Sequence, residues 1–147
     1  MSTITKGIRI ETRLKLVEYH LSAENLHNVA AIMQTFGRKP TFVLNGIPLV
    51  GHESICALYE GFGFGERGSF SDLHGDVKHR YANDEAVILE LFLSGRHTGG
   101  WQGIAATHRE FKIPACTIFT FDDEDRLASE RVYFDGALLL RQLGVIL

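Results

Sequence analysis

The sequence has no long apolar run and no excess of one charge. None of its apolar stretches approaches the ~20 residues that a membrane helix needs, and residues 1–11 contain no apolar signal core followed by a small-residue cleavage site. The net charge is −3, and the lysines and arginines are scattered along the chain, which argues against nucleic-acid binding. We therefore expect a cytoplasmic protein that binds neither a membrane nor nucleic acid.

Cysteine is scarce, and the histidines are not paired. Cys56 and Cys116 are the only two thiols, and neither has a neighbour at metal-ligand spacing, so we interpret them as buried apolar side chains and not as a disulfide. Seven histidines are present, but His20 and His27 are too far apart in sequence to form a His-x-x-x-His pair. We expect no metal site and no cofactor.

The first half of the chain has a helical period. Its length of 147 residues, with 45% apolar and 22% charged residues, predicts one domain over 1–147 with a single core. Apolar residues recur at spacings of four, three and four at Ile10, Leu14, Val17 and Leu21, which predicts an amphipathic helix. Shorter helices are expected over 26–33 and 52–61, separated by a strand over 41–44 and an Asn45-Gly46 turn.

The second half changes to the period of strands. Strands are predicted over 70–81, 86–97, 108–121 and 127–134, followed by a short helix from Asp135. Pro114 predicts an edge position or a bulge, and the acidic run 122–125 predicts a solvated hairpin turn. Helices followed by antiparallel strands indicate an α+β fold. A bent strand would let the sheet curve strongly, with the N-terminal helices packed on it and an apolar pocket inside.

Two stretches of the second half form a recognisable pattern. The first is Gly95-Arg-His97-Thr-Gly99 followed by Gly103-Ile104; the second is Asp125-Arg-Leu127, Glu130-Arg-Val-Tyr133-Phe-Asp135 and Gln142-Leu-Gly144. Together they resemble the SnoaL-like polyketide cyclase family of the nuclear transport factor two-like superfamily. The resemblance implies a cone-shaped α+β barrel, usually a homodimer, with an apolar pocket and no metal. The segment 105–108 departs from the family's proline-rich turn, so the substrate class is not carried over.

The resemblance implies a catalytic pair, Asp135 and His97. Asp135 matches the acid–base aspartate of the family's cyclases, and a carboxylate facing an apolar pocket would favour its neutral form. The alternative is structural, because an aspartate directly before a helix is a favoured N-cap. His97, at the end of a buried strand, could hydrogen-bond Asp135 or a substrate oxygen, or it could simply turn the strand end.

Two strand residues near Asp135 are candidates for substrate contact. Tyr133 and Arg131 alternate in phase with Asp135, so all three should share one face of the strand. The opposite face should carry Glu130, Val132 and Phe134. A tyrosine hydroxyl in a pocket could donate to an oxyanion, although a strand tyrosine is more often part of the core.

Three further candidates lie on other segments. Glu90, inside the most apolar strand, is either a second acid–base group or, as we favour, the partner of an arginine such as Arg96 or Arg131. Trp101 could stack on a flat ligand or serve a dimer contact. Phe62 belongs to an apolar, glycine-containing stretch that could act as a lid.

Three functions remain open at this point. The first is a cofactor-free enzyme that binds a small, largely apolar carbonyl compound and moves a proton, as in an aldol-type cyclisation or an isomerisation; Asp135 would be the base, and His97 or Tyr133 would stabilise the enolate. The second is a limonene-type epoxide hydrolase, for which strand 86–97 lacks the required aspartate. The third is a non-catalytic binding or dimerisation module.

Overall fold

The computed structural model describes residues 2–146. Most of its helical segments lie in the first half of the chain, and most of its strands lie in the second half. The helices are α1 (Thr3–Asn25), α2 (Val29–Gln34), α3 (His52–Tyr59), which continues into a π-helical turn η1 (Glu60–Phe64), and α4 (Gly136–Gln142). The strands are β1 (Phe36–Leu44), β2 (Ile47–Val50), β3 (Phe70–Ala82), β4 (Ala86–His97), β5 (Glu110–Phe121) and β6 (Leu127–Phe134). The helices and strands predicted from the sequence all form.

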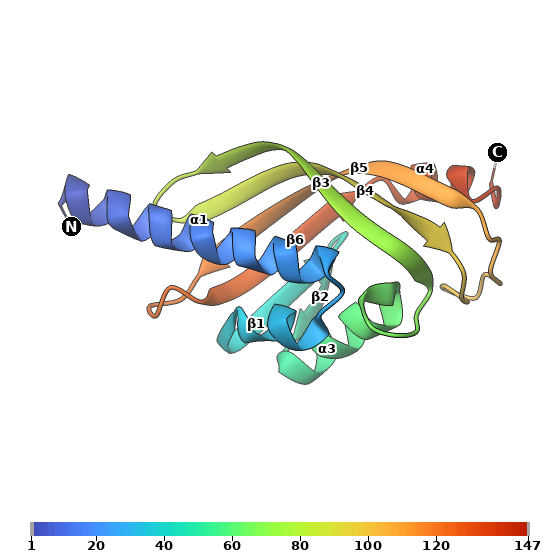
Figure 1. Ribbon diagram of the computed structural model, residues 1–147, viewed down its shortest axis with the longest axis horizontal. Coiled ribbons are helices and arrows are strands. Elements are labelled where there is room, and N and C mark those ends of the chain that lie inside the picture. Colours follow the sequence, from blue (N-terminus) through green and yellow to red (C-terminus); the bar gives the residue numbers. More distant parts are fainter. Residues whose placement is uncertain (1, 147) are drawn as a thin grey trace.

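The strands build one curved sheet. Its order is β2-β1-β6-β5-β4-β3, with β1 parallel to β6 and every other neighbour antiparallel. In Figure 1, the long strands β3 and β4 curve above α1, and β1 and α3 lie below that helix in this view. The predicted α+β class, with helices packed on a strongly curved and mostly antiparallel sheet, is confirmed.

The predicted Asn45-Gly46 turn joins two strands, β1 and β2, into a hairpin. Asn45 and Gly46 both adopt positive φ angles, 47° and 86°, as the central residues of a tight hairpin turn do. The short strand β2 was not among the predicted elements; it lies at the edge of the sheet, where the missing N–H of Pro48 is tolerated. Pro114 also fits its prediction, because β6 pairs with β5 only from Ala115 onward.

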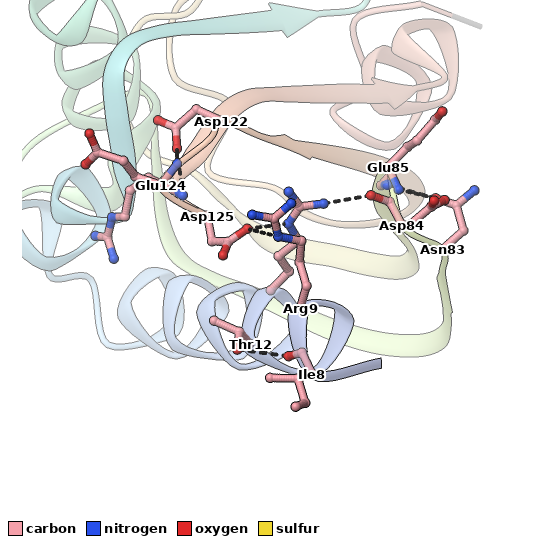
Figure 2. Close-up of polar contacts among 12 residues, drawn as sticks. Ile8, Arg9, Thr12, Asn83, Asp84, Glu85, Asp122, Glu124 and Asp125 are labelled. Atoms are coloured by element: carbon pink, nitrogen blue, oxygen red, sulfur yellow. Dashed lines mark hydrogen bonds and ion pairs between the residues drawn. The ribbon is translucent and has the colours of Figure 1, made fainter. Parts of the chain in front are cut away.

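Helix α1 is fastened to the ends of two hairpins (Figure 2). Arg9 and Arg13 place their Nε atoms 3.2 Å and 2.9 Å from the same Oδ1 of Asp125, in the β5–β6 turn. Arg13 also donates from Nη1 to the carbonyl oxygen of Asp84, in the β3–β4 turn, at 2.7 Å. The acidic hairpin turn therefore forms as predicted, and Asp125 in addition anchors a buried arginine.

The predicted apolar stripe of α1 is only part of its buried face. Val17 is buried, and Leu14 and Leu21 are half-buried, but Arg13 and His20 are buried as well. Polar groups thus occupy core positions of α1. The two cysteines are free, and each is half-buried, so they are less buried than the sequence predicted. No helix within residues 2–146 is both long and apolar enough to cross a membrane.

Candidate functional site

An apolar cavity of about 80 Å³ lies between the helices and the concave face of the sheet. Six aromatic side chains contribute to its wall: Phe42, Tyr59, Phe62, Phe64, Phe119 and Phe134. The polar residues on the wall are Glu24, Asn25, Tyr59, Thr117 and Glu130; neither lysine nor arginine lines it in the described part of the chain. An apolar chamber with a few convergent polar groups is the usual form of a small-molecule site.

The polar end of the cavity is organised around Glu130. Its Oε1 atom lies 2.7 Å from Nε2 of His20. The hydroxyl of Tyr59 donates to both carboxylate oxygens, at 2.8 Å and 3.0 Å. His20 is completely buried, and only 2% of Glu130 is exposed. These contacts therefore form where little water competes for them.

The orientation of His20 is set by a threonine behind it. The Thr35 hydroxyl donates to the carbonyl oxygen of Ile32 at 2.6 Å and so accepts from Nδ1–H of His20 at 2.8 Å. Nε2 is therefore the atom that faces Glu130. Burial lowers the pKa of His20, but the negative charge of Glu130, with a smaller contribution from Glu24 where that group is ionised, outweighs this effect and raises the pKa overall. The contact with Glu130 thus favours the imidazolium form of His20.

Glu24 is the second carboxyl group of the cavity wall. It lies one turn after His20 on α1, with Oε1 3.5 Å from Nε2 of His20 and 16% of its side chain exposed. Burial raises the pKa of Glu24 to about 8, the charge of Glu130 adds to the rise, and His20 opposes it. Glu24 therefore holds a proton at neutral pH, while burial and Glu130 raise the pKa of Tyr59 well above its ordinary value.

These side chains come together because the fold aligns three elements. His20 and Glu24 share a face of α1 at a spacing of four residues, Tyr59 ends α3, and Glu130 points inward from β6. The last turn of α1 is fixed to β3 by Asn25, whose amide donates to the carbonyl oxygen of Gly75 at 3.0 Å and accepts from its N–H at 2.9 Å. The clamp holds Glu24 against the cavity.

His20, Glu24 and Glu130 also have the composition of a metal site. Their candidate ligand atoms all lie within 4.8 Å of one another. The short His20–Glu130 contact and the hydrogen bonds from Tyr59 and Thr35 account for this geometry by hydrogen bonding alone. Proton chemistry is therefore the use that the arrangement supports most directly.

Asp135 and His97, the pair inferred from the resemblance, are not on the cavity wall. Asp135 is exposed and caps α4, its Oδ1 accepting from the N–H of Leu138 at 3.1 Å, which is the structural alternative considered above. His97 is fully buried, and its Nδ1 contacts the hydroxyl of Thr107 at 3.0 Å. Its Nε2 has no hydrogen-bond partner within residues 2–146. The structure does not join the two side chains by a hydrogen bond.

The alternation predicted for β6 is correct, but the cavity lies on the face opposite to the one chosen. Glu130, Val132 and Phe134 line the cavity. Arg131 and Tyr133 point to the convex side of the sheet, where Tyr133 is 41% exposed. The proposed contacts of these two residues with a substrate therefore have no support from their position.

The three remaining candidates for substrate contact, Phe62, Trp101 and Glu90, lie in different environments. Phe62 lines the cavity and stacks on Phe64, with ring centroids 6.2 Å apart. Trp101 is half-buried away from the cavity and packs edge-on against Phe70. Glu90 is exposed on the convex face, where it raises the pKa of Tyr81 by a hydrogen bond; the expected partner Arg96 instead pairs with Glu110.

The sequence analysis missed His20, Glu24, Tyr59 and Glu130 as functional residues. A signal was present in α1, because Arg13, Val17, His20 and Ala23 recur at helical spacing, so His20 falls on the buried face. For Glu130, a carboxylate in phase with Val132 and Phe134 was the corresponding sign. Their meeting across the cavity depends on tertiary packing and could not be predicted.

Comparisons with known proteins agree with the geometry of the fold. Solved structures that resemble the chain include TsrD from Streptomyces laurentii, with 22% identity, a TM-score of 0.79 and coverage of 92% of this chain and 97% of that one. A candidate polyketide cyclase from Xanthomonas campestris pv. campestris has 16% identity, a TM-score of 0.82 and coverage of 92% and 98%.

A third structure is a hypothetical protein from Catenulispora acidiphila with a ketosteroid isomerase-like fold, in complex with trimethylamine; it has 19% identity, a TM-score of 0.72 and coverage of 88% and 92%. No curated protein sequence matches the chain. The family model of SnoaL-like polyketide cyclases matches residues 47–143, which is more than half of the chain. The chain therefore belongs to the SnoaL-like polyketide cyclase family.

Proposed function

We propose that the cavity binds a small, largely apolar carbonyl compound and that Glu130 removes a proton from the carbon next to the carbonyl group, without a cofactor. The observation that carries the proposal is one carboxyl group, 2.7 Å from the His20 imidazole and hydrogen-bonded by the Tyr59 hydroxyl, at the end of an otherwise apolar chamber. A base in such a place is screened from water and close to the bound carbon acid.

The reaction step is a proton transfer that needs no oxidant or reductant. The α-carbon–hydrogen bond breaks and its proton passes to a carboxylate oxygen of Glu130. The electron pair of that bond forms a carbon–carbon double bond, and the carbonyl oxygen becomes an enolate oxygen. Return of the proton to another carbon gives isomerisation, and attack of the enolate carbon on a second carbonyl gives aldol-type cyclisation.

His20 is well suited to balance the charge of this step. Before the transfer, its imidazolium pairs with the Glu130 carboxylate at 2.7 Å. After the transfer Glu130 is neutral and the enolate carries the negative charge, so the positive charge of His20 then faces the enolate. The cavity end keeps the same net charge throughout, which avoids creating an unpaired buried charge.

The test uses simple cyclic ketones as probes. We expect the wild-type protein to be stabilised against heat by cyclohexanone or 2-cyclohexenone, and not by the matched hydrocarbon cyclohexane at the same concentration. In deuterated buffer, ¹H NMR should show faster loss of the α-proton signal with protein than with buffer alone. Stabilisation without any exchange would support a binding module, and neither effect with any ketone would reject the proposed function.

A further inference from the structure

We infer that Glu24 is a second catalytic residue of the cavity: as a neutral carboxylic acid, it donates a hydrogen bond to the carbonyl oxygen on which the enolate charge develops. The inference rests on the proposed function, since it names the group that binds the oxygen of the same substrate. It assigns opposite protonation states to two carboxyl groups that share one cavity.

Most polar side chains on the cavity wall already have hydrogen-bond partners. Tyr59 already donates to Glu130. Asn25 is exposed, and its amide uses its oxygen and one N–H on the backbone of Gly75. Among the polar side chains of the wall that are not exposed, within the described part of the chain, Glu24 and the hydroxyl of Thr117 remain free to donate to a ligand.

Glu24 is less closely paired with positive charge than Glu130 is. The groups that face it are His20 on its own helix, Glu130 from β6 and Tyr59 from α3. One imidazolium serves two carboxyl groups, and it lies 2.7 Å from Glu130 but 3.5 Å from Glu24. Glu130 also receives the Tyr59 hydrogen. Two like charges this close are unfavourable, so the proton stays on the less well paired carboxyl group.

The direction of the pKa shift supports this assignment. Burial first, and then the charge of Glu130, raise the pKa of Glu24 to about 8. A carboxylic acid that stays neutral at pH 7 is a strong donor for an oxyanion in a chamber that excludes water. Glu130 and Glu24 are thus suited to opposite tasks, one to accept a proton from carbon and one to bind oxygen.

The protonation state can be measured without any ligand. Carboxyl ¹³C NMR of glutamate-labelled protein should show one resonance that titrates near pH 8 and is absent from Glu24→Gln. Glu11→Gln is the control, because Glu11 is an exposed residue of the same helix, and its substitution should leave the resonance near pH 8 in place. Titration of Glu24 near its ordinary value of 4.5 would overturn the inference and leave the role of Glu130 untouched.

The second readout is the pH dependence of cyclohexanone binding, since this ketone does not titrate. Wild-type affinity should be constant near neutral pH and fall as the pH rises through about 8. Glu24→Gln keeps a donor and should bind with little dependence on pH, whereas Glu24→Leu should bind about three- to tenfold more weakly at neutral pH. If Thr117→Val reduces the affinity and Glu24→Leu does not, the oxygen is bound by Thr117 and the inference is rejected.

Discussion

The Nε2 atom of His20 lies 2.7 Å from Oε1 of Glu130, joining α1 to β6 across the polar end of the cavity. His20 is 0% exposed and Glu130 is 2% exposed, so both are shielded from solvent. A buried ion pair of this kind contributes little net stability while both partners are present. Removal of one partner leaves the other as a buried charge without a counterion, and the first prediction follows from this.

His20→Ala should destabilise the fold by about 3–5 kcal/mol, because Glu130 would remain buried without its positive partner. Urea unfolding followed by circular dichroism measures the change. The control is His79→Ala, since His79 is exposed on β3 and its removal should cost less than about 0.5 kcal/mol. Equal effects of the two substitutions would show that the pair does not form.

The stability of the protein should fall as the pH rises. The pKa of Glu24 is about 8 in the folded state against an ordinary 4.5, so the folded state holds this proton more tightly than the unfolded state does. The contribution of Glu24 to the free energy of unfolding is therefore complete below about pH 4.5 and is lost as the pH rises to about 8. The raised pKa of His20 acts in the same direction above 6.5.

At the steepest point the loss from one such group is about 1.4 kcal/mol per pH unit. Urea unfolding at several pH values should reveal this slope in the wild type and a shallower one in Glu24→Gln, because that variant cannot bind the extra proton. A wild-type stability that rises between pH 5 and pH 8 would contradict the assigned pKa shifts.

Asp125→Asn should weaken the attachment of α1 to the two hairpins. Asparagine tolerates the positive φ of 59° at this position, so the substitution removes the charge that Arg9 and Arg13 share and leaves the turn intact. We expect a loss of about 1–3 kcal/mol, because Arg13 is buried. Asp123→Asn, in the same turn, is the control and should have almost no effect on thermal unfolding.

Gly63→Ala should disturb the aromatic wall of the cavity. Gly63 has a φ of 135°, and a Cβ there would collide with the carbonyl oxygen of Phe70. The expected cost is about 1–3 kcal/mol, together with weaker ketone binding, because Phe62 and Phe64 flank this residue on the wall. Gly61→Ala meets open space and should be tolerated; equal behaviour of the two variants would contradict the role given to Gly63.

The sequence predicted the elements well because their signals are local. The Asn45-Gly46 turn, the apolar period of α1 and the alternation of β6 each depend on neighbouring residues. The candidate site depended on which face of β6 meets the cavity, for which the apolar residues Val132 and Phe134 were a local sign that the resemblance outweighed. The resemblance favoured Asp135, whose position before α4 gave an equally local alternative as an N-cap, and the structure places it there.

The most direct test of the account compares two carboxyl variants in ketone α-proton exchange. Glu130→Gln removes the proposed base, and Asp135→Asn removes the carboxylate inferred from the resemblance while keeping an N-cap of similar strength. The account predicts that Glu130→Gln lowers the protein-dependent exchange rate about 10²- to 10⁴-fold and that Asp135→Asn leaves it unchanged, with ketone binding retained in both. Loss of exchange in Asp135→Asn and its persistence in Glu130→Gln would contradict the account.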